Sequence, residues 1–319
     1  MDIIEQAAKR LEELRRAGIE LPESAVADRG DALPTGPVTE RSGPRPVSAT
    51  TAAESAASRT VELDLAALGS RGIVTPDADR SQLADELRVL KRPLLRNVAG
   101  KSAAPVKDAN LIMITSAVPA EGKTHLATNL AISIAMELDH TVLLVDADVA
   151  RPSIPTALGI SRDEKGLLDV LQDSSLDLSQ VLLRTNIEKL SILPAGTQHP
   201  RATELLASDA MNKLLADMAS RYSDRIIIFD SPPLLLTTEA RALATHMGQV
   251  VLVVKAESTT HAMVKSAVAT LDACPVKMVV LNQAVMHMDA HGYGYGYGYG
   301  YGKRSSRSGT GRAELGQEG

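Results

Sequence analysis

Residues 111–124 read Leu-Ile-Met-Ile-Thr-Ser-Ala-Val-Pro-Ala-Glu-Gly-Lys-Thr, and this segment carries the strongest structural signal in the chain. Its apolar first half predicts a buried strand, and residues 124–138 behind it predict a helix. A loop between such a strand and helix presents backbone N–H groups and a helix N-terminus to phosphate groups. The loop differs from G-x-x-x-x-G-K-[ST] at Ala117, where only a small side chain fits. A nucleotide-binding loop is therefore the favoured interpretation, and a chance Gly-Lys-Thr is the alternative.

The last two residues of this loop have the chemistry that a bound triphosphate needs. Lys123 is placed to reach the β- and γ-phosphates, and the hydroxyl of Thr124 is placed to ligate Mg²⁺. The predicted cofactors are therefore ATP and Mg²⁺.

Apolar strands and helices alternate after the loop. Strands are predicted at residues 142–146, 190–193, 225–230, 250–255 and 276–282, and helices at residues 209–221, 238–247 and 260–273. Nearly continuous apolar strands interleaved with helices are typical of a parallel sheet that is covered on both faces. The predicted fold is α/β, a P-loop NTPase-like, mostly parallel sheet with helices on both faces.

Three aspartates end two of these strands. Asp146 and Asp148 close the strand at 142–146, and Asp230 closes the strand at 225–230. Ligands of open parallel sheets bind outside the carboxyl ends of the strands, so we expect these carboxylates at the edge that carries Lys123. A single strand-end aspartate is more often a turn residue. Three of them beside a phosphate loop favour metal binding and proton transfer.

The remaining segments differ in composition from this core. Residues 1–21 are predicted to form an amphipathic N-terminal helix, residues 22–78 a largely disordered linker rich in Pro, Ala, Ser and Thr, and residues 291–319 a disordered tail. The P-loop domain is predicted at residues 79–290, beginning with a helix at 79–97. These boundaries follow from changes in periodicity along the chain.

Five of the six tyrosines alternate with glycine in the tail. They are Tyr293, Tyr295, Tyr297, Tyr299 and Tyr301. Such a segment cannot build a core, because glycine loses the most backbone entropy on ordering. It is either a sticky low-complexity tail or a set of exposed phenols held out for modification.

Charge and cysteine content exclude several classes of protein. The formal net charge of −5 argues against binding nucleic acid through bulk electrostatics. Cys274 is the single cysteine, which excludes an internal disulfide framework and suits a reducing compartment. No apolar run approaches the ~20 residues that span a bilayer. We therefore expect a cytoplasmic protein.

In combination, these motifs resemble those of the bacterial tyrosine kinases, which are P-loop autokinases unrelated to eukaryotic protein kinases. The resemblance rests on Ser116-Ala-Val-Pro-Ala-Glu-Gly-Lys-Thr124, Val145-Asp-Ala-Asp-Val-Ala-Arg-Pro152 and Ile228-Phe-Asp-Ser-Pro-Pro233, and on the tyrosine-rich tail. Residues 3–14 and 86–95 and the Gly-Tyr tail look like the branch found with exosortase (PEP-CTERM) exopolysaccharide loci.

The resemblance implies an ATP-dependent protein-tyrosine autokinase that phosphorylates its own tail tyrosines and regulates exopolysaccharide synthesis and export. The implied catalytic residues are Lys123, Asp146, Asp148 and Asp230, with Asp146 orienting or deprotonating the tyrosine and Thr124, Asp148 and Asp230 holding Mg²⁺. The implied ATP-binding residues are Ala117, Val118, Pro119, Ala120, Glu121, Gly122, Lys123, Thr124, His125, Arg151 and Asn282. Among these, His125 is included by position alone and Asn282 as an adenine contact.

The resemblance also implies partners. A ring-forming E-x-x-R-x-x-R motif of the family aligns, inexactly, with Asp85, Arg88 and Lys91. The expected partners are further copies of the chain, with a ring as one form of the homo-oligomer, a separate inner-membrane polysaccharide co-polymerase that activates the kinase, and a cognate phosphotyrosine phosphatase. The expected location is cytoplasmic and peripheral at the inner membrane through that partner, with no nucleic acid bound.

The main alternative is a partitioning-type P-loop ATPase that switches its assembly state without phosphorylating tyrosine. That class carries a lysine five residues before the invariant lysine of the loop, and here this position is Val118. A second alternative is a non-catalytic scaffold with an adhesive tail. Labelled ATP separates them, since only a kinase transfers the label to tyrosine.

Overall fold

The computed structural model describes residues 59–78, 80–221 and 225–284. The predicted N-terminal helix at residues 1–21, most of the predicted linker and the five tail tyrosines lie outside these residues. None of the described helices combines the length and apolar character that crossing a membrane requires.

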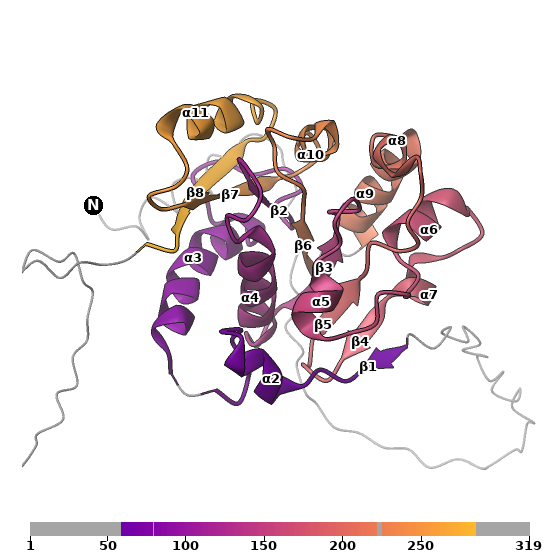
Figure 1. The fold of residues 1–319 in the computed structure, drawn as a ribbon, viewed down its shortest axis with the longest axis horizontal. Coiled ribbons are helices and arrows are strands. Elements are labelled where there is room, and N and C mark those ends of the chain that lie inside the picture. Colours follow the sequence, from indigo (N-terminus) through magenta and orange to yellow (C-terminus); the bar gives the residue numbers. More distant parts are fainter. Residues whose placement is uncertain (1–58, 79, 222–224, 285–319) are drawn as a thin grey trace, which may run out of the picture. The chain divides into compact units, whose positions relative to one another are not determined.

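One sheet contains all strands of the described residues, in the order β1-β4-β5-β3-β6-β2-β7-β8 (Figure 1). The strands are β1 (Thr60–Val61), β2 (Leu111–Ser116), β3 (Thr141–Asp146), β4 (Leu183–Thr185), β5 (Leu190–Leu193), β6 (Arg225–Asp230), β7 (Gln249–Lys255) and β8 (Val276–Asn282). Neighbouring strands run parallel except β4 and β5. The predicted mostly parallel sheet is confirmed, and all six predicted strands form.

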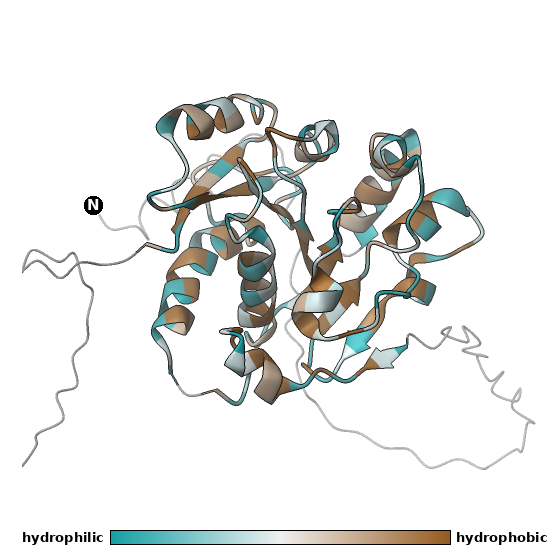
Figure 2. Cartoon of the chain, viewed as in Figure 1, coloured by the Kyte–Doolittle hydropathy of each residue, from teal (hydrophilic) through white to brown (hydrophobic). Residues whose placement is uncertain are grey.

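Helices cover both faces of this sheet (Figure 1). They are α2 (Leu65–Ser70), α3 (Gln82–Val98), α4 (Lys123–Ala135), α5 (Ile154–Leu158), α6 (Leu167–Gln172), α7 (Leu178–Val181), α8 (Ala202–Leu206), α9 (Asp209–Arg221), α10 (Thr238–Ala244) and α11 (His261–Ala269). Side chains of a strand alternate between faces. Ile112 and Ile114 of β2 therefore pack with α2 to α5, whereas Leu111 and Met113 pack with α6 to α11. The mostly hydrophobic colouring of the central strands in Figure 2 reflects this burial on both sides.

Residues 59–78 correct the predicted linker, which extended to residue 78. β1 pairs with β4, and α2 begins at the N-cap Asp64, whose side chain accepts a hydrogen bond from Ala67 N. Leu63 and Leu68 are 2% and 1% exposed and belong to the core beneath α3 and α4. The prediction was wrong here because two or three apolar side chains are enough to bind a short segment to an existing core. A local sequence pattern does not reveal contacts with residues that lie far away in the sequence, such as those of β4.

The three residues of the predicted oligomer motif lie on α3 but face differently. Arg88 and Asp85 are exposed and form an ion pair one turn apart. Lys91 is buried, lies 2.6 Å from Glu137 Oε1 and donates to the Ser133 carbonyl at 2.6 Å. Lys91 therefore fastens α3 to the end of α4 within its own chain, and its predicted contact with a neighbouring subunit stays a prediction.

Candidate active site

The phosphate loop connects β2 to α4 through two residues in left-handed conformation. Gly122, the N-cap of α4, has a φ of 95°, and a methyl group added there would lie 2.1 Å from Asn282 Nδ2. Only glycine fits at this position. Ala120 has a φ of 63°. This conformation costs an L-residue roughly 1–2 kcal/mol, so glycine would adopt it with less strain than Ala120.

Glu121 holds the loop in shape from inside. Its carboxylate is 1% exposed; Oε2 accepts from Val118 N at 2.7 Å, and Oε1 accepts from Lys255 N at 3.3 Å and from the Thr259 hydroxyl. The loop is thereby tied to the end of β7. The resemblance implied that Glu121 binds ATP, and this clamp was not predicted. A glutamate in a loop expected to bind phosphate, which its charge would repel, is the one signal that pointed to it.

Asn282 ties the same loop to the end of β8. Its Nδ2 donates to the carbonyl of Glu121 at 2.8 Å. In the structure this amide supports the backbone of the phosphate loop, and its predicted contact with adenine stays a prediction. A strand-end residue is thus positioned beside the nucleotide loop as expected.

Lys123 joins two of the predicted aspartates. Its Nζ lies 2.6 Å from Asp148 Oδ2 and 3.7 Å from Asp230 Oδ1. Burial alone lowers the pKa of Lys123, but the charges of Asp230 and Asp148 outweigh it and raise that pKa above its ordinary value. The lysine therefore stays protonated and ready for phosphate groups.

Asp146 is more deeply placed than Asp148. It is fully buried, and its Oδ2 accepts from the N–H groups of Ser153 and Ile154, both at 3.0 Å, where α5 begins. Asp146 lies directly opposite Asp230 in the register of β3 and β6. Burial, together with the charge of Asp230, raises the pKa of Asp146 to about 8. Burial also raises the pKa of Asp230, to about 6, although Lys123 opposes the shift.

A pocket of about 500 Å³ opens in front of the loop. Its lining is Pro119, Ala120, Gly122, Lys123, Thr124, His125, Asp148, Ala150, Arg151, Ser153, Pro232, Pro233, Leu236 and Thr237. Asp148 and Arg151 thus reach the pocket, whereas Asp146 and Asp230 lie behind it. The apolar wall that includes Pro233 and the 64% exposed Leu236 was not predicted. The Pro-Pro pair that follows Asp230 was the only sequence feature that indicated this wall.

His125 lies at the border of this pocket. Its Nε2 is 3.1 Å from Asn129 Nδ2, and burial lowers its pKa. An uncharged, hydrogen-bonded imidazole on the first turn of α4 fits a packing role better than phosphate binding.

The buried carboxylates fit a hydrated metal and its phosphate ligands. Oδ1 of Asp146 is buried and has no hydrogen-bond partner, and the oxygens of the fully buried Asp230 face only Thr124 and Lys123, with no close hydrogen bond. Buried polar atoms are seldom left in this state, so they indicate a missing polar ligand. Within the described ranges, no three carboxylate, histidine or cysteine side chains converge to hold a metal directly. The donor set therefore fits Mg²⁺ held by a hydroxyl, phosphate oxygens and water.

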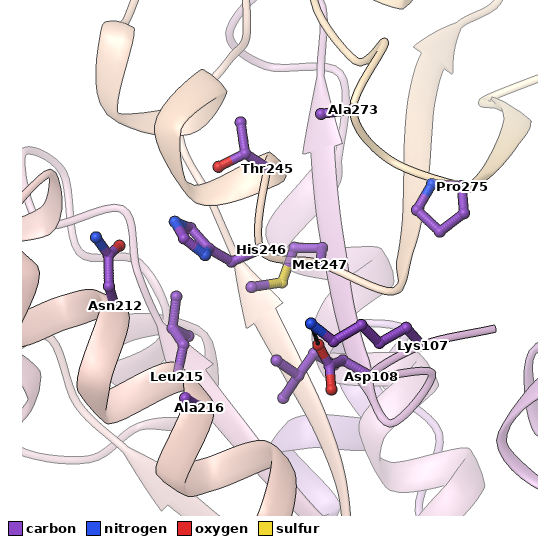
Figure 3. Close-up of a pocket in the computed structure, with 11 residues that line it drawn as sticks. Lys107, Asp108, Asn212, Leu215, Ala216, Thr245, His246, Met247, Ala273 and Pro275 are labelled. Carbon is purple, nitrogen blue, oxygen red and sulfur yellow. Dashed lines mark ion pairs between the residues drawn. The ribbon is translucent and has the colours of Figure 1, made fainter.

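A separate pocket of about 390 Å³ lies at the opposite edge of the sheet (Figure 3). Its residues precede strands: Asp108 comes before β2, Met247 before β7 and Pro275 before β8. Lys107 and Asp108 form an ion pair of 3.9 Å at its side (Figure 3). Parallel sheets bind ligands at the carboxyl ends of their strands. None of the predicted site residues lines this pocket.

Comparison with known proteins agrees with the arrangement of the site. The family model described as AAA domain matches residues 110–283. The chain is 34% identical to the tyrosine-protein kinase YwqD of Bacillus subtilis (strain 168) over 168 residues, which are 53% of this chain and 69% of YwqD. It is 30% identical to the tyrosine-protein kinase wzc of Salmonella typhimurium over 175 residues, which are 54% of this chain and only 24% of wzc.

A solved structure gives the same result. The crystal structure of the VpsO kinase domain superimposes with a TM-score of 0.51 at 30% sequence identity, covering 64% of this chain and all of that domain. Membership of the exosortase-associated branch stays a prediction. The sequence identity to these kinases, the shared fold and the lysine–aspartate cluster at the end of the phosphate loop together show that this chain belongs to the bacterial tyrosine-protein kinase family.

Proposed function

We propose that this tyrosine kinase transfers the γ-phosphoryl group of ATP to tyrosines of its own Gly-Tyr tail, residues 293–301. The observation that carries the proposal is Lys123, protonated between Asp148 and Asp230 at the end of the phosphate loop. Tyr293 follows Asn282 by eleven residues, and an extended chain covers at most ~3.6 Å per residue. The tail is thus long enough to reach the pocket of its own or a neighbouring chain.

We assign to Asp148 the role of the base that accepts the phenol proton of the acceptor tyrosine. Asp146 was predicted for this role, but Asp146 is fully buried and occupied by two backbone N–H groups, whereas Asp148 lines the pocket. Phosphate oxygens would take the place of Asp148 as partners of Lys123. Asp148 would then be free to act as a base.

The transfer follows from these positions. The phenol oxygen attacks the γ-phosphorus, the bond to the β–γ bridging oxygen breaks, ADP leaves, and the phenol proton passes to Asp148. A free tyrosine has a pKa of about 10, so the attack needs such a base at neutral pH. When bound, Mg²⁺ supplies neutralisation of the phosphate charge, and Thr124 and, through water, Asp230 would hold it.

We also propose that tail phosphorylation regulates assembly. Each phosphate adds about −1.5 to −2 charges, so five add on the order of −8 to −10 and repel neighbouring tails. In this proposal an inner-membrane polysaccharide co-polymerase activates the kinase at the cytoplasmic face, a phosphatase resets the tail, and the cycle regulates exopolysaccharide export. The exposed Asp85 and Arg88 on α3 are the residues left for an oligomer contact.

The test compares the full-length chain with Lys123→Met and, as a matched control, Lys265→Met on the exposed side of α11. Each is incubated with Mg-ATP and an activating co-polymerase segment, and residues 293–301 are examined by mass spectrometry. We expect phosphotyrosine in the wild type and the control and none in Lys123→Met. Phosphate release without tail modification would instead support the assembly-switch ATPase.

A further inference from the structure

A second pocket of about 450 Å³ adjoins the catalytic pocket on the side of α5. The two share Thr124, His125 and Ser153 in their linings. The second pocket is distinguished by two arginines, Arg71 from the turn after α2 and Arg162 from the loop after α5. It therefore places two cations beside the point where the phosphoryl group is transferred.

Both guanidinium groups are anchored to the same short helix. Arg71 Nη1 donates to the carbonyls of Thr156 and Ala157 at 3.3 and 3.4 Å, and Arg162 Nε donates to Thr156 Oγ1 at 3.0 Å. Neither group has a carboxylate partner in the part of the chain that the structure describes. Two neighbouring cations without a counter-ion repel each other, and a guanidinium has five N–H donors, most of which are unused here. This arrangement suits a phosphate group, which forked arginine donors bind well.

We infer that this pocket binds the phosphate of a tail phosphotyrosine and thereby presents another tyrosine of the same tail to the catalytic pocket. The inference rests on the proposed function, because the tail is its ligand. Residues 291–302 contain no aspartate or glutamate, so phosphorylation is the only source of an anion within this stretch. The pocket therefore distinguishes a tail that has already been modified from one that has not.

The spacing of the tail fits two adjoining pockets. In an extended chain, side chains two residues apart point to the same side and are separated by about 7 Å. The strict Gly-Tyr alternation places all five phenols on one side in that conformation. One phosphotyrosine held by Arg71 and Arg162 would direct a neighbouring phenol towards Thr124 and Asp148. The first transfer to a tail is then slow, and the following ones are faster.

Binding tests the pocket without requiring catalysis. The full-length chain, saturated with Mg-ADP so that the phosphate loop is occupied, is titrated into fluorescent Gly-pTyr-Gly-Tyr-Gly and Gly-Tyr-Gly-Tyr-Gly, and anisotropy is recorded. We expect the phosphopeptide to bind about tenfold more tightly, as two charge-assisted contacts would give. Inorganic phosphate at equal concentration should compete only weakly, because it lacks the second phenol.

Two double variants of equal charge locate the effect. Arg71→Gln/Arg162→Gln should abolish the preference for the phosphopeptide, whereas Arg92→Gln/Arg96→Gln, exposed on α3, should keep it. Arg162→Gln alone, which loses only contacts to a threonine hydroxyl, should lower the preference and guards against a folding defect in the double variant. Equal binding of both peptides to the wild type, or an unchanged preference in Arg71→Gln/Arg162→Gln, overturns the inference.

The distribution of tail phosphates separates this inference from the proposed function. With Mg-ATP, the wild type should pass quickly from unmodified to multiply modified tails, whereas Arg71→Gln/Arg162→Gln should accumulate singly modified tails. Identical distributions would refute the pocket and leave the kinase proposal intact. Absence of any tail phosphate in the wild type would refute the kinase proposal, and the anisotropy result would then decide on the pocket by itself.

Discussion

Replacing Asp146 with asparagine should make this protein more stable. Asp146 is fully buried and faces Asp230, and its Oδ1 has no hydrogen-bond partner. Asparagine has the same shape, and its carbonyl oxygen can accept the two bonds from Ser153 N and Ile154 N that Oδ2 accepts now. The substitution therefore removes a buried ionisable group without removing the contacts that position α5.

The size of the effect follows from the pKa of Asp146, which is raised from 3.8 to about 8. Between these values the folded protein binds more protons than the unfolded chain, so the free energy of unfolding falls as the pH rises through this window. One pKa unit corresponds to about 1.4 kcal/mol, which makes roughly 4 kcal/mol the upper limit at pH 7. We expect Asp146→Asn to gain about 2–4 kcal/mol at pH 7 and little near pH 4, where the pH has barely passed the ordinary pKa at which the unfolded carboxyl ionises.

Urea unfolding at pH 4, 5, 6, 7 and 8 measures this gain. Asp148→Asn is the matched control, since it removes one negative charge from the pocket lining and breaks the 2.6 Å ion pair with Lys123. The control should lose stability, with no gain that grows with pH. The reasoning fails if Asp146→Asn and the wild type unfold at the same urea concentration at pH 7 and 8, or if the difference between them is independent of pH.

Three further substitutions test the loop and the corrected domain boundary. Gly122→Ala should weaken nucleotide binding at least tenfold in a titration with fluorescent ATP, because its methyl group would lie 2.1 Å from Asn282 Nδ2 and φ is 95°; binding at wild-type affinity would contradict the loop geometry. Glu121→Gln should cost about 1–3 kcal/mol in thermal unfolding, since one amide oxygen cannot accept all three bonds of the carboxylate; a neutral effect would show that the clamp is dispensable. Leu63→Ala should lower the free energy of unfolding, measured in urea, by about 2–5 kcal/mol because Leu63 is 2% exposed. A loss below about 0.5 kcal/mol would show that residues 59–78 do not pack on the core and belong to the linker, as first predicted.

Much of the fold could be predicted because its signals are local. The apolar run before Gly122 and the helix behind Lys123 predict the nucleotide loop, and the two strands ending in Asp146 and Asp230 predict the acidic edge. All six strands predicted this way form, at nearly the predicted bounds. Strands buried on both faces need uninterrupted apolar residues, and this requirement is visible in the sequence itself.

The direction in which each side chain points was decided only by the tertiary structure. Asp146 and Asp148 are two residues apart, yet one is sealed beneath α5 and the other lines the pocket. Lys91 looks like an interface residue in the sequence, yet it holds α3 to α4. Arg71 and Arg162 are separated by ninety-one positions and meet at Thr156. The periodicity of the sequence predicts whether a position is buried. The residue that covers it often comes from a distant part of the chain, and only tertiary packing brings the two together.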